Sequence, residues 1–582
     1  MRIAGRHRDY PVTRREAWLS AAAVFAVALL IRIAAAALVR FPIPEDTAYY
    51  AGVARNLAEG RGLISDALWS YQTQPLVVPR AAFELWLPLP SLLEAIPAAL
   101  LGAAEWFRAA QVVSVLASSV VAVLAWRLGA DVAAEMKLPV GRARTMGVGT
   151  GLVAAVLGPL VIYGALPDST ALFAALSLAA CLLMARIAAR SNMAATAGAT
   201  ATAAEAAGGP ATAGATANAA ATFDRRLLAL GLLLGFAALT RSEAIWLALT
   251  WAIVAWRWTA GTRRRRAGLI AVPAIVAILV VAPWVARDWQ AFGTPLPGQT
   301  IGNALYLHST DIFAYSFPPT LTRFLSAGPA TLASLYAGGI ANDLFGVLII
   351  TAFPVGLLGL LALPWVGRRT ALRPLVLASV LTFVVTSLAF PVATLSGTFL
   401  HAAGSAFVLL CVSAVGALDA LIVRIGRIRH WTRPVAWLGP AFAIAAIGPL
   451  CAISVGSISH QAEDVAARYE ALPAAMARAG VPLDGTAPVI TDSPIWLAEA
   501  TRVRTLALPE ESPTSVVALA NHFGATLLIV RDGTDREWPE ILHGDQPDAK
   551  CFQEVPLTDI SGHKPANGSP LASIHVYRIV CT

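Results

Sequence analysis

Two adjacent carboxylates, Glu45 and Asp46, follow directly on a long apolar run and open the segment "EDTAYYAGVARNLAEGRG". A carboxylate beside a substrate hydroxyl can take its proton as a general base. Asp46 has a second interpretation, because an Asp before the helix predicted over 47–59 can accept free backbone N–H groups as a cap. The residue types therefore allow acid–base chemistry and helix capping at the same place.

More ionisable side chains stand where other apolar segments end, on the same predicted side of a membrane. Asp168 lies in the turn "YGALPDSTALF", and Arg241 and Glu243 lie in the turn "ALTRSEAIW". Arginine suits a phosphate because its planar guanidinium donates two parallel hydrogen bonds. Structural roles are equally open, since Asp168 can cap the next helix and Arg241 can pair with Glu243. Carboxylates and arginines converging on one face predict a substrate cleft.

Three further residues belong to the same predicted face, namely Arg55, Arg287 and His401. Ionisable groups near a bilayer are functional candidates by default. Two of them also have a plainer interpretation: Arg55 can lie on the solvated face of the helix over 47–59, and His401 starts a span, where a histidine is more often structural than catalytic. No zinc, catalytic-triad or phosphate-loop pattern competes with this cluster.

The composition requires a membrane around these residues. The chain has 582 residues, of which 57% are hydrophobic and 13% charged, whereas soluble proteins have about 25% charged residues. Apolar runs of about 20 residues, the length that spans a bilayer, recur along the chain. The net charge of +8 does not indicate a nucleic-acid partner, because Lys and Arg cluster between the apolar runs, as the positive-inside rule requires.

The basic clusters predict a cytoplasmic N-terminus and an external C-terminus. The eleven predicted spans are 17–39, 108–129, 146–166, 170–189, 226–240, 243–259, 268–286, 342–365, 374–392, 401–423 and 434–457. Residues 85–103 contain three prolines and Glu94, so they are predicted to form an interfacial or re-entrant helix. This topology leaves long external loops at 40–107 and 288–341.

We predict two domains, a transmembrane domain over 1–458 and an extracytoplasmic α/β domain over 459–582. The Ala/Thr/Gly-rich stretch 190–224 has little to bury and is predicted to be a disordered cytoplasmic linker. In the external domain, strand-like runs such as "TLLIVRD" alternate with helical ones. Cys551 and Cys581 both lie there, and outside the cytoplasm such a pair is a candidate disulfide.

The motifs of the first loop resemble those of polytopic GT-C glycosyltransferases, most of all the protein O-mannosyltransferase and lipid A aminoarabinose transferase relatives. The resemblance covers about 17–425. It rests on "EDTAYYAGVARNLAEGRG" and "ELWLPLPSLLEAIPAALLG", then "LPDSTALFAALSLAACLL", "ALTRSEAIWL", "APWVARDWQAFGTPLP" and "GTFLHAAGSAFVLL". It implies an α-helical polytopic GT-C fold in the plasma membrane. The implied activity is inverting transfer of a sugar from a polyprenyl-phosphate donor to an extracytoplasmic protein, lipid or cell-envelope glycan.

The resemblance also implies roles for single residues. Asp46 matches the acidic position that opens the family's active site, and Glu45 is its neighbour, so which of the two is the base stays open. The remaining roles are donor-phosphate binding by Arg55, Arg241 and Arg287, acceptor or metal contact by Asp168, Glu243 and His401, and cleft-lining aromatics Tyr49, Tyr50, Trp69 and Tyr71. The pattern requires no cofactor, and it leaves a divalent cation, Mg²⁺ or Mn²⁺, open.

Two other function classes compete with the enzyme. A transporter or flippase of a lipid-linked sugar would need polar groups along a midplane pathway, and it would often have paired repeats with broken helices. The predicted spans carry few charges in their middles, and no such repeat is visible. A sensor or assembly protein working through its external domain would leave the first-loop cluster unexplained. The sequence therefore favours the glycosyltransferase.

Overall fold

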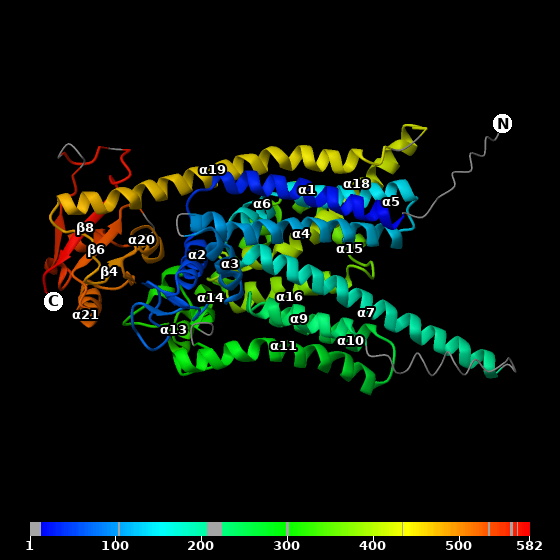
Figure 1. Cartoon of the computed structure of the whole chain (residues 1–582), viewed down its shortest axis with the longest axis horizontal. Helices are drawn as coiled ribbons and strands as arrows, with labels where there is room; N and C mark the ends of the chain where they lie inside the picture. The colour runs from blue at the N-terminus through cyan, green and yellow to red at the C-terminus, as the bar shows by residue number, and fades with distance from the viewer. Residues whose placement is uncertain are drawn as a thin grey trace.

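A helical bundle carries a small α/β domain at one end (Figure 1). In this computed structural model the described residues are 13–102, 105–206, 224–297, 302–432, 435–533, 536–558, 563–566 and 568–581. The main helices are α1 (Arg14–Leu38), α2 (Glu45–Ala58), α3 (Leu89–Leu101), α4 (Trp106–Glu135), α5 (Val140–Val156), α6 (Gly158–Ala165), α7 (Ser169–Ala206), α9 (Arg226–Ala238), α10 (Ala244–Trp258), α11 (Arg263–Phe292), α13 (Leu321–Ser326), α14 (Gly328–Ala341), α15 (Val355–Val366), α16 (Arg373–Ala389), α17 (Thr398–Ala402), α18 (Gly404–Ile428) and α19 (Leu438–Arg478).

Seven of the described helices are long and apolar enough to cross a membrane, or eight if the bent pair α5–α6 counts as one span. The described chain therefore has the helices of a multi-pass membrane protein. Of the predicted spans, the helices α9, α10, α15 and α16 are shorter apolar helices. A 13-residue helix such as α9 rises only about 20 Å, less than the ~30 Å hydrocarbon core. Fewer of the described helices are long enough to cross a membrane than the eleven spans that the sequence predicts.

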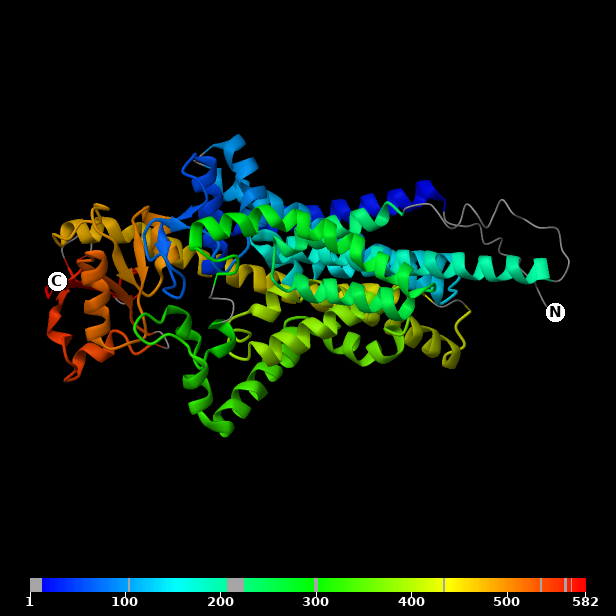
Figure 2. The same ribbon diagram turned by 90° about the horizontal axis from the view of Figure 1, so that it is seen from below.

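The predicted span 342–365 is wrong in its bounds. The apolar helix of spanning length runs over Gly328–Ile350, formed by α14 and the π-helix η4 (Asn342–Ile350), and α15 begins separately at Val355. The chain turns at Pro354, whose ring nitrogen has no hydrogen to continue the helical pattern. The predicted external loop 288–341 therefore contains helices, and α13 and α14 protrude from the side of the bundle in Figure 2.

A buried arginine stabilises the bend between α5 and α6, which lie at 57° to each other. Pro159, near the start of α6, has no N–H for the carbonyl of Ala155. The guanidinium of Arg32 in α1 donates to that carbonyl and to the carbonyl of Ala154 at 3.2 Å. Its Nε donates to Ser118 Oγ at 3.0 Å. Arg32 thereby supplies donors that the bend removes, and α6 leads from the bend to the turn that carries Asp168.

The C-terminal domain is built on a six-stranded mixed sheet in the order β2-β5-β4-β6-β8-β7. The strands and their helices are β2 (Ala67–Leu68), β4 (Val489–Thr491), α20 (Pro494–Thr501), β5 (Thr505–Ala507), α21 (Pro513–Phe523), β6 (Leu527–Arg531), β7 (Phe552–Val555) and β8 (Ile574–Ile579). Strands β2, β5, β4 and β6 are parallel, whereas β8 is antiparallel to β6 and to β7. A disulfide joins Cys551, just before β7, to Cys581, just after β8.

Strand β2 belongs to the first loop and not to the C-terminal segment. Its Ala67 and Leu68 pair in parallel with Thr505 and Leu506 of β5. The remaining short strands, β1 (Ile64–Ser65) and β3 (Arg80–Ala81), pair with each other in the same loop. The first loop is therefore hydrogen-bonded into the C-terminal domain, an arrangement that sequence analysis did not predict.

Two predicted boundaries fall inside helices. Helix α19 runs without interruption over Leu438–Arg478, so residue 458 lies within it, and in Figure 1 it connects the bundle to the C-terminal domain. Helix α7 continues to Ala206, which includes the first part of the predicted disordered linker 190–224. The rest of that predicted linker, 207–223, lies outside the described residues.

Candidate active site

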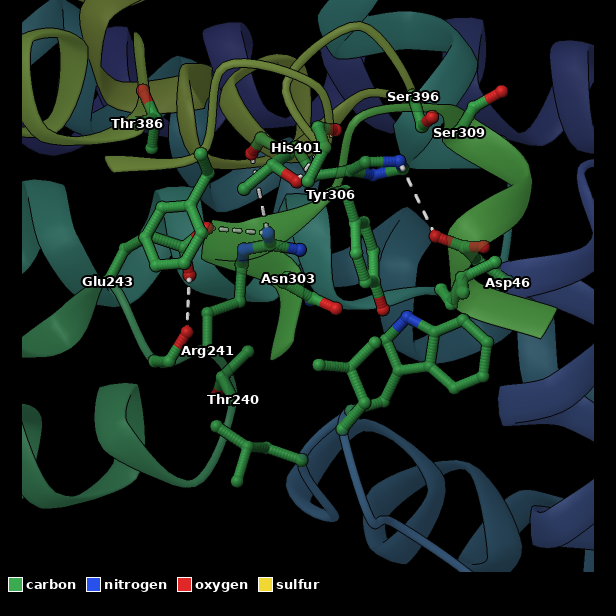
Figure 3. Close-up of a pocket in the computed structure, with 18 of the residues that line it drawn as sticks. Asp46, Thr240, Arg241, Glu243, Asn303, Tyr306, Ser309, Thr386, Ser396 and His401 are labelled. Atoms are coloured by element: carbon green, nitrogen blue, oxygen red, sulfur yellow. Dashed lines mark hydrogen bonds and ion pairs between the residues drawn. The ribbon is translucent and has the colours of Figure 1, made fainter. Parts of the chain in front are cut away.

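A pocket of about 690 Å³ lies where the first loop, two helix turns and the segment 303–313 meet (Figure 3). Its polar lining comes from Asp46, Tyr50, Thr240, Arg241, Ser242, Glu243, Asn303, Tyr306, Ser309, Thr310, Thr386, Ser396, Thr398, His401 and Arg536. Its other walls are largely apolar and aromatic, with Leu85, Trp86, Leu87, Ile245, Trp246, Ile312, Phe313, Phe390 and Ala393. Four of the sequence motifs, which stand far apart along the chain, contribute lining residues to this pocket.

A histidine connects the two aspartates that sequence analysis singled out. His401 Nε2 lies 3.7 Å from Asp46 Oδ2, and its Nδ1 lies 3.5 Å from Asp168 Oδ2. Nδ1 also lies 2.8 Å from the hydroxyl of Thr170. Asp46 and His401 line the pocket, whereas Asp168 is buried behind the imidazole ring. The order is therefore Asp46, His401, Asp168, from the pocket inwards, and the first pair is joined by a dashed line in Figure 3.

The surroundings of Asp46 favour a proton acceptor. Burial raises the pKa of this carboxyl group, the neighbouring His401 opposes that rise, and the charge of Asp168 adds to it. A carboxylate with a raised pKa binds a proton more strongly than an ordinary aspartate and is therefore a better general base at neutral pH.

Asp46 and Asp168 differ in whether they cap a helix. Helix α2 has Pro44 at its N-cap without a side-chain hydrogen bond, and among the described residues Asp46 accepts none from a backbone N–H. Capping by Asp46 is therefore wrong in this structure. Asp168 does cap α7, since its Oδ1 accepts the backbone N–H of Thr170 at 2.7 Å. Its capping role and its contact with His401 coexist.

Glu45 does not line the pocket, although it is next to Asp46 in the chain. It lies among groups of the C-terminal domain, where Asp492 and Arg531 form an ion pair at 3.1 Å. Burial, and then the charge of Asp492, raise the pKa of Glu45 to about 8. Consecutive residues of a helix differ by about 100° in direction, so neighbouring carboxylates reach different surroundings.

Arg241 is the one predicted phosphate-binding arginine that the structure brings to the pocket. Its Nη2 contacts Glu243 Oε1 at 2.7 Å, and its Nη1 donates to Ser169 Oγ at 3.0 Å. The pairing with Glu243 that sequence analysis left open is therefore present, and both residues line the pocket. The two side chains are fixed by each other at the pocket wall, as Figure 3 shows.

Arg55 and Arg287 do not reach this pocket. Arg55 forms an ion pair with Glu499 of α20 at 2.6 Å and stacks over Trp106 at 4.5 Å. Arg287 pairs with Asp288 at 2.9 Å and stacks over Trp284 at 4.6 Å. The helices that carry these arginines direct them towards other partners, so neither is positioned for a phosphate bound in the pocket.

Of the four predicted cleft aromatics, only Tyr50 lines the pocket. Tyr49 and Trp69 are buried in an aromatic cluster behind the wall, where the Tyr49 hydroxyl accepts the backbone N–H of Phe83 at 2.6 Å. The hydroxyl of Tyr71 donates to the carbonyl of Ala507 at 2.5 Å in the C-terminal domain. The other three aromatics therefore support the first loop and do not line the pocket.

Several lining residues were not predicted from the sequence, among them Trp86, Trp246, Tyr306 and Arg536. Trp86 and Trp246 stand within the motifs "ELWLPLP" and "TRSEAIWL", so an aromatic beside a polar motif was a usable signal. Arg536 had no such signal, because it lies in the C-terminal segment, far from every motif. Among the described residues, no group of three or more His, Cys, Asp or Glu side chains could hold a metal ion.

Comparison with known proteins finds similarity at the level of structure. No family model and no curated protein matches the chain. The chain is similar to ArnT from Cupriavidus metallidurans bound to undecaprenyl phosphate, with 13% identity over 97% of this chain and 98% of that chain and a TM-score of 0.49. It is also similar to the oligosaccharyltransferase of Archaeoglobus fulgidus tethered with an acceptor peptide, with 13% identity over 92% of this chain and 72% of that chain and a TM-score of 0.48.

Proposed function

We propose that the protein is a membrane glycosyltransferase that moves a sugar from a polyprenyl-phosphate donor to an acceptor outside the cytoplasm, with inversion at the anomeric carbon. The observation that carries this proposal is the spatial order Asp46, His401, Asp168, in which the first two side chains line a pocket that Arg241 also lines. A base and a cation on one pocket are the two groups that an inverting transfer from a phosphate needs. They also belong to the motifs that resemble GT-C enzymes.

Asp46 is the base in this proposal. The acceptor oxygen attacks the anomeric carbon while its proton passes to Asp46 Oδ, and the bond from that carbon to the phosphate oxygen breaks. The electron pair leaves with the phosphate. His401, 3.7 Å from Asp46, holds the carboxylate in position. The imidazole is oriented in turn by the Thr170 hydroxyl, 2.8 Å from Nδ1, with Asp168 3.5 Å from the same nitrogen. Glu45 is given no part in the transfer, because its side chain does not line the pocket.

Arg241 stabilises the departing phosphate. Its guanidinium lines the pocket and is held by Glu243 and Ser169, so it needs no rearrangement when negative charge develops. Arg55 and Arg287 are not proposed for this role, since both are paired outside the pocket.

The apolar part of the pocket favours a lipid-linked substrate over a free nucleotide sugar. Leu85, Leu87, Ile245, Trp246 and Phe390 line it beside the polar groups, and Ile245 is 59% exposed. An isoprenoid chain would cover such a surface, and each buried methylene contributes about 0.8 kcal/mol. A water-soluble donor would leave these side chains in contact with water.

A panel of radiolabelled polyprenyl-phosphate sugars, incubated with membranes that contain the protein, tests this function. We expect radioactivity to move from at least one donor to an acceptor that is not extractable as the donor lipid. Repeating the assay with EDTA, and then with added Mg²⁺ or Mn²⁺, tests the divalent cation that the sequence left open. Movement of the intact donor across sealed vesicles without sugar transfer would instead identify a transporter or flippase.

The proposed orientation places the N-terminus in the cytoplasm of a plasma-membrane protein and the pocket outside. The supporting observation is that Arg-rich segments such as 263–266 start α11 at the end of the bundle remote from the C-terminal domain (Figure 1). An alkaline phosphatase fused after the C-terminal domain should therefore be active. An inactive fusion, with a cytoplasmic fluorescent reporter working at the same position, would contradict this topology.

A further inference from the structure

Among the described residues of the C-terminal domain, Arg536 alone lines the pocket. Arg536 follows β6 in the chain and is part of the pocket lining, although every other described lining residue lies between Asp46 and His401. The proposed function assigns Arg536 no role. Its guanidinium can support the fold, and its place in the pocket lining also allows it to contact a ligand.

Two contacts hold the guanidinium of Arg536 in place. Its Nη1 donates to the carbonyl of Leu508 at 3.0 Å, and its central carbon lies 4.7 Å from the ring centroid of Phe313. Phe313 belongs to the pocket wall, so the arginine is stacked on that wall. Its side chain is only 11% exposed, which leaves it little freedom to swing away.

The positive charge of Arg536 acts on the carboxyl groups of Glu510 and Glu45, but among the described residues it forms no close ion pair with either. The nearest carboxylate oxygen, Glu510 Oε2, is 4.0 Å from Nε, which is beyond hydrogen-bond distance. The other oxygen of Glu510 accepts the backbone N–H of Glu537 at 2.6 Å. Among the described residues, Nη2 of Arg536 has no acceptor. Arg241 in the same pocket differs, because Glu243 contacts it at 2.7 Å.

The C-terminal domain is fixed to the rest of the site, so the position of Arg536 is not that of a loosely tethered module. Strand β2 pairs with β5. Helix α2, which carries Asp46, is joined to the domain by the ion pair Arg55–Glu499 at 2.6 Å and by the ion pair Glu59–Arg502 at 2.5 Å. The domain and the proposed base therefore hold a defined geometry relative to each other.

We propose that Arg536 is a substrate-binding residue that holds an oxyanion, a phosphate or a carboxylate, so that the C-terminal domain forms one wall of the active site. A stacked guanidinium with an unused terminal donor is the geometry that binds such a group. The proposal rests on the proposed function for its ligand, and the oxyanion has two sources. It is the phosphate of the lipid-linked donor, or an acidic group on the acceptor.

Direct binding to the full-length protein in lipid nanodiscs tests this inference without relying on transfer. The probes are undecaprenyl phosphate against neutral undecaprenol for the donor source, and glucose 6-phosphate against glucose for the acceptor source. The variants are Arg536→Gln, Arg536→Lys and the control Arg504→Gln. Arg504 lies in the same domain and also donates to backbone carbonyls, those of Gly485 and Thr486, but it does not line the pocket.

We expect Arg536→Gln to weaken binding of one of the two phosphate probes by about 10-fold or more, which corresponds to about 1.4 kcal/mol. The probe that is affected identifies the source. Binding of undecaprenol and glucose should not change, Arg504→Gln should bind like the wild type, and Arg536→Lys should retain part of the affinity because it keeps the charge. Thermal unfolding of each variant verifies that it is folded.

The inference is overturned if Arg536→Gln binds both phosphate probes like the wild type, or if the wild type binds neither. Failure of this inference can be distinguished from failure of the proposed function. A protein that transfers no sugar but loses phosphate binding in Arg536→Gln would end the proposed function and keep the inference. Normal sugar transfer together with unchanged phosphate binding in Arg536→Gln would end the inference alone.

Discussion

Replacing Asp46 by Asn removes the proposed base while leaving its helix intact. Asp46 is the second residue of α2, and among the described residues it accepts no backbone N–H, so no cap is lost. The amide has nearly the volume of the carboxylate, and burial already disfavours the ionised form. The unfolding free energy should therefore change by only about 0.5 kcal/mol, because no cap is lost and the contact with His401 is 3.7 Å long, beyond hydrogen-bond distance.

The effect on transfer should be far larger. An amide cannot take the acceptor proton, and loss of a general base lowers turnover by about 10²–10⁴, which corresponds to about 2.7–5.4 kcal/mol of transition-state stabilisation. The matched control is Glu45→Gln, because it makes the same chemical change in the adjacent residue, whose side chain lies outside the pocket. Transfer by that variant should stay close to the wild-type rate.

Initial rates of sugar transfer would be measured for both variants in membranes, with the rate divided by the amount of folded protein. Wild-type activity should also decline as the pH falls through the raised pKa of Asp46, since only the ionised carboxylate accepts a proton. Near-normal transfer by Asp46→Asn would refute the base assignment. A greater loss in Glu45→Gln would move the base to Glu45 and would show that the side chain reorients.

Three further predictions concern stability. The pKa of Glu45 is raised from 4.5 to about 8, so between these pH values the folded state keeps a proton that the unfolded state has lost. The free energy of unfolding should therefore fall as the pH rises from 5 to 8. An identical dependence of this free energy on pH in Glu45→Gln would contradict the prediction. Reducing the disulfide between Cys551 and Cys581, 30 residues apart, should lower the free energy of unfolding of the C-terminal domain by about 3.5 kcal/mol. An unchanged denaturation midpoint of this domain in reductant would argue against such a stabilisation. Arg55→Gln should lower the free energy of unfolding by about 3–5 kcal/mol, because it leaves Glu499 buried and unpaired. The double variant with Glu499→Gln should recover part of the lost melting temperature. A double variant that recovers none of it would mean that the two side chains are not coupled.

The sequence alone determined the features that depend on local composition. A helix in a bilayer satisfies its own backbone hydrogen bonds, so a run of about 20 apolar residues is informative without knowledge of its neighbours. That is why α1, α4, α7, α11, α18 and α19 all overlap predicted spans. Short motifs such as "EDTAYY" and "LPDSTALF" likewise marked Asp46 and Asp168, because polar residues at the end of an apolar run are locally visible.

Only the tertiary structure decided which of these polar residues meet. Arg55, Arg241 and Arg287 are alike as sequence features, yet only Arg241 lines the pocket, since the direction of a side chain depends on how its helix packs. Arg536 lines the pocket although it lies in the C-terminal domain, whose strand β5 pairs with β2 of the first loop, a contact between residues more than 400 positions apart. Such contacts arise from the packing of complete elements, and the local sequence around each residue contains no record of its distant partner.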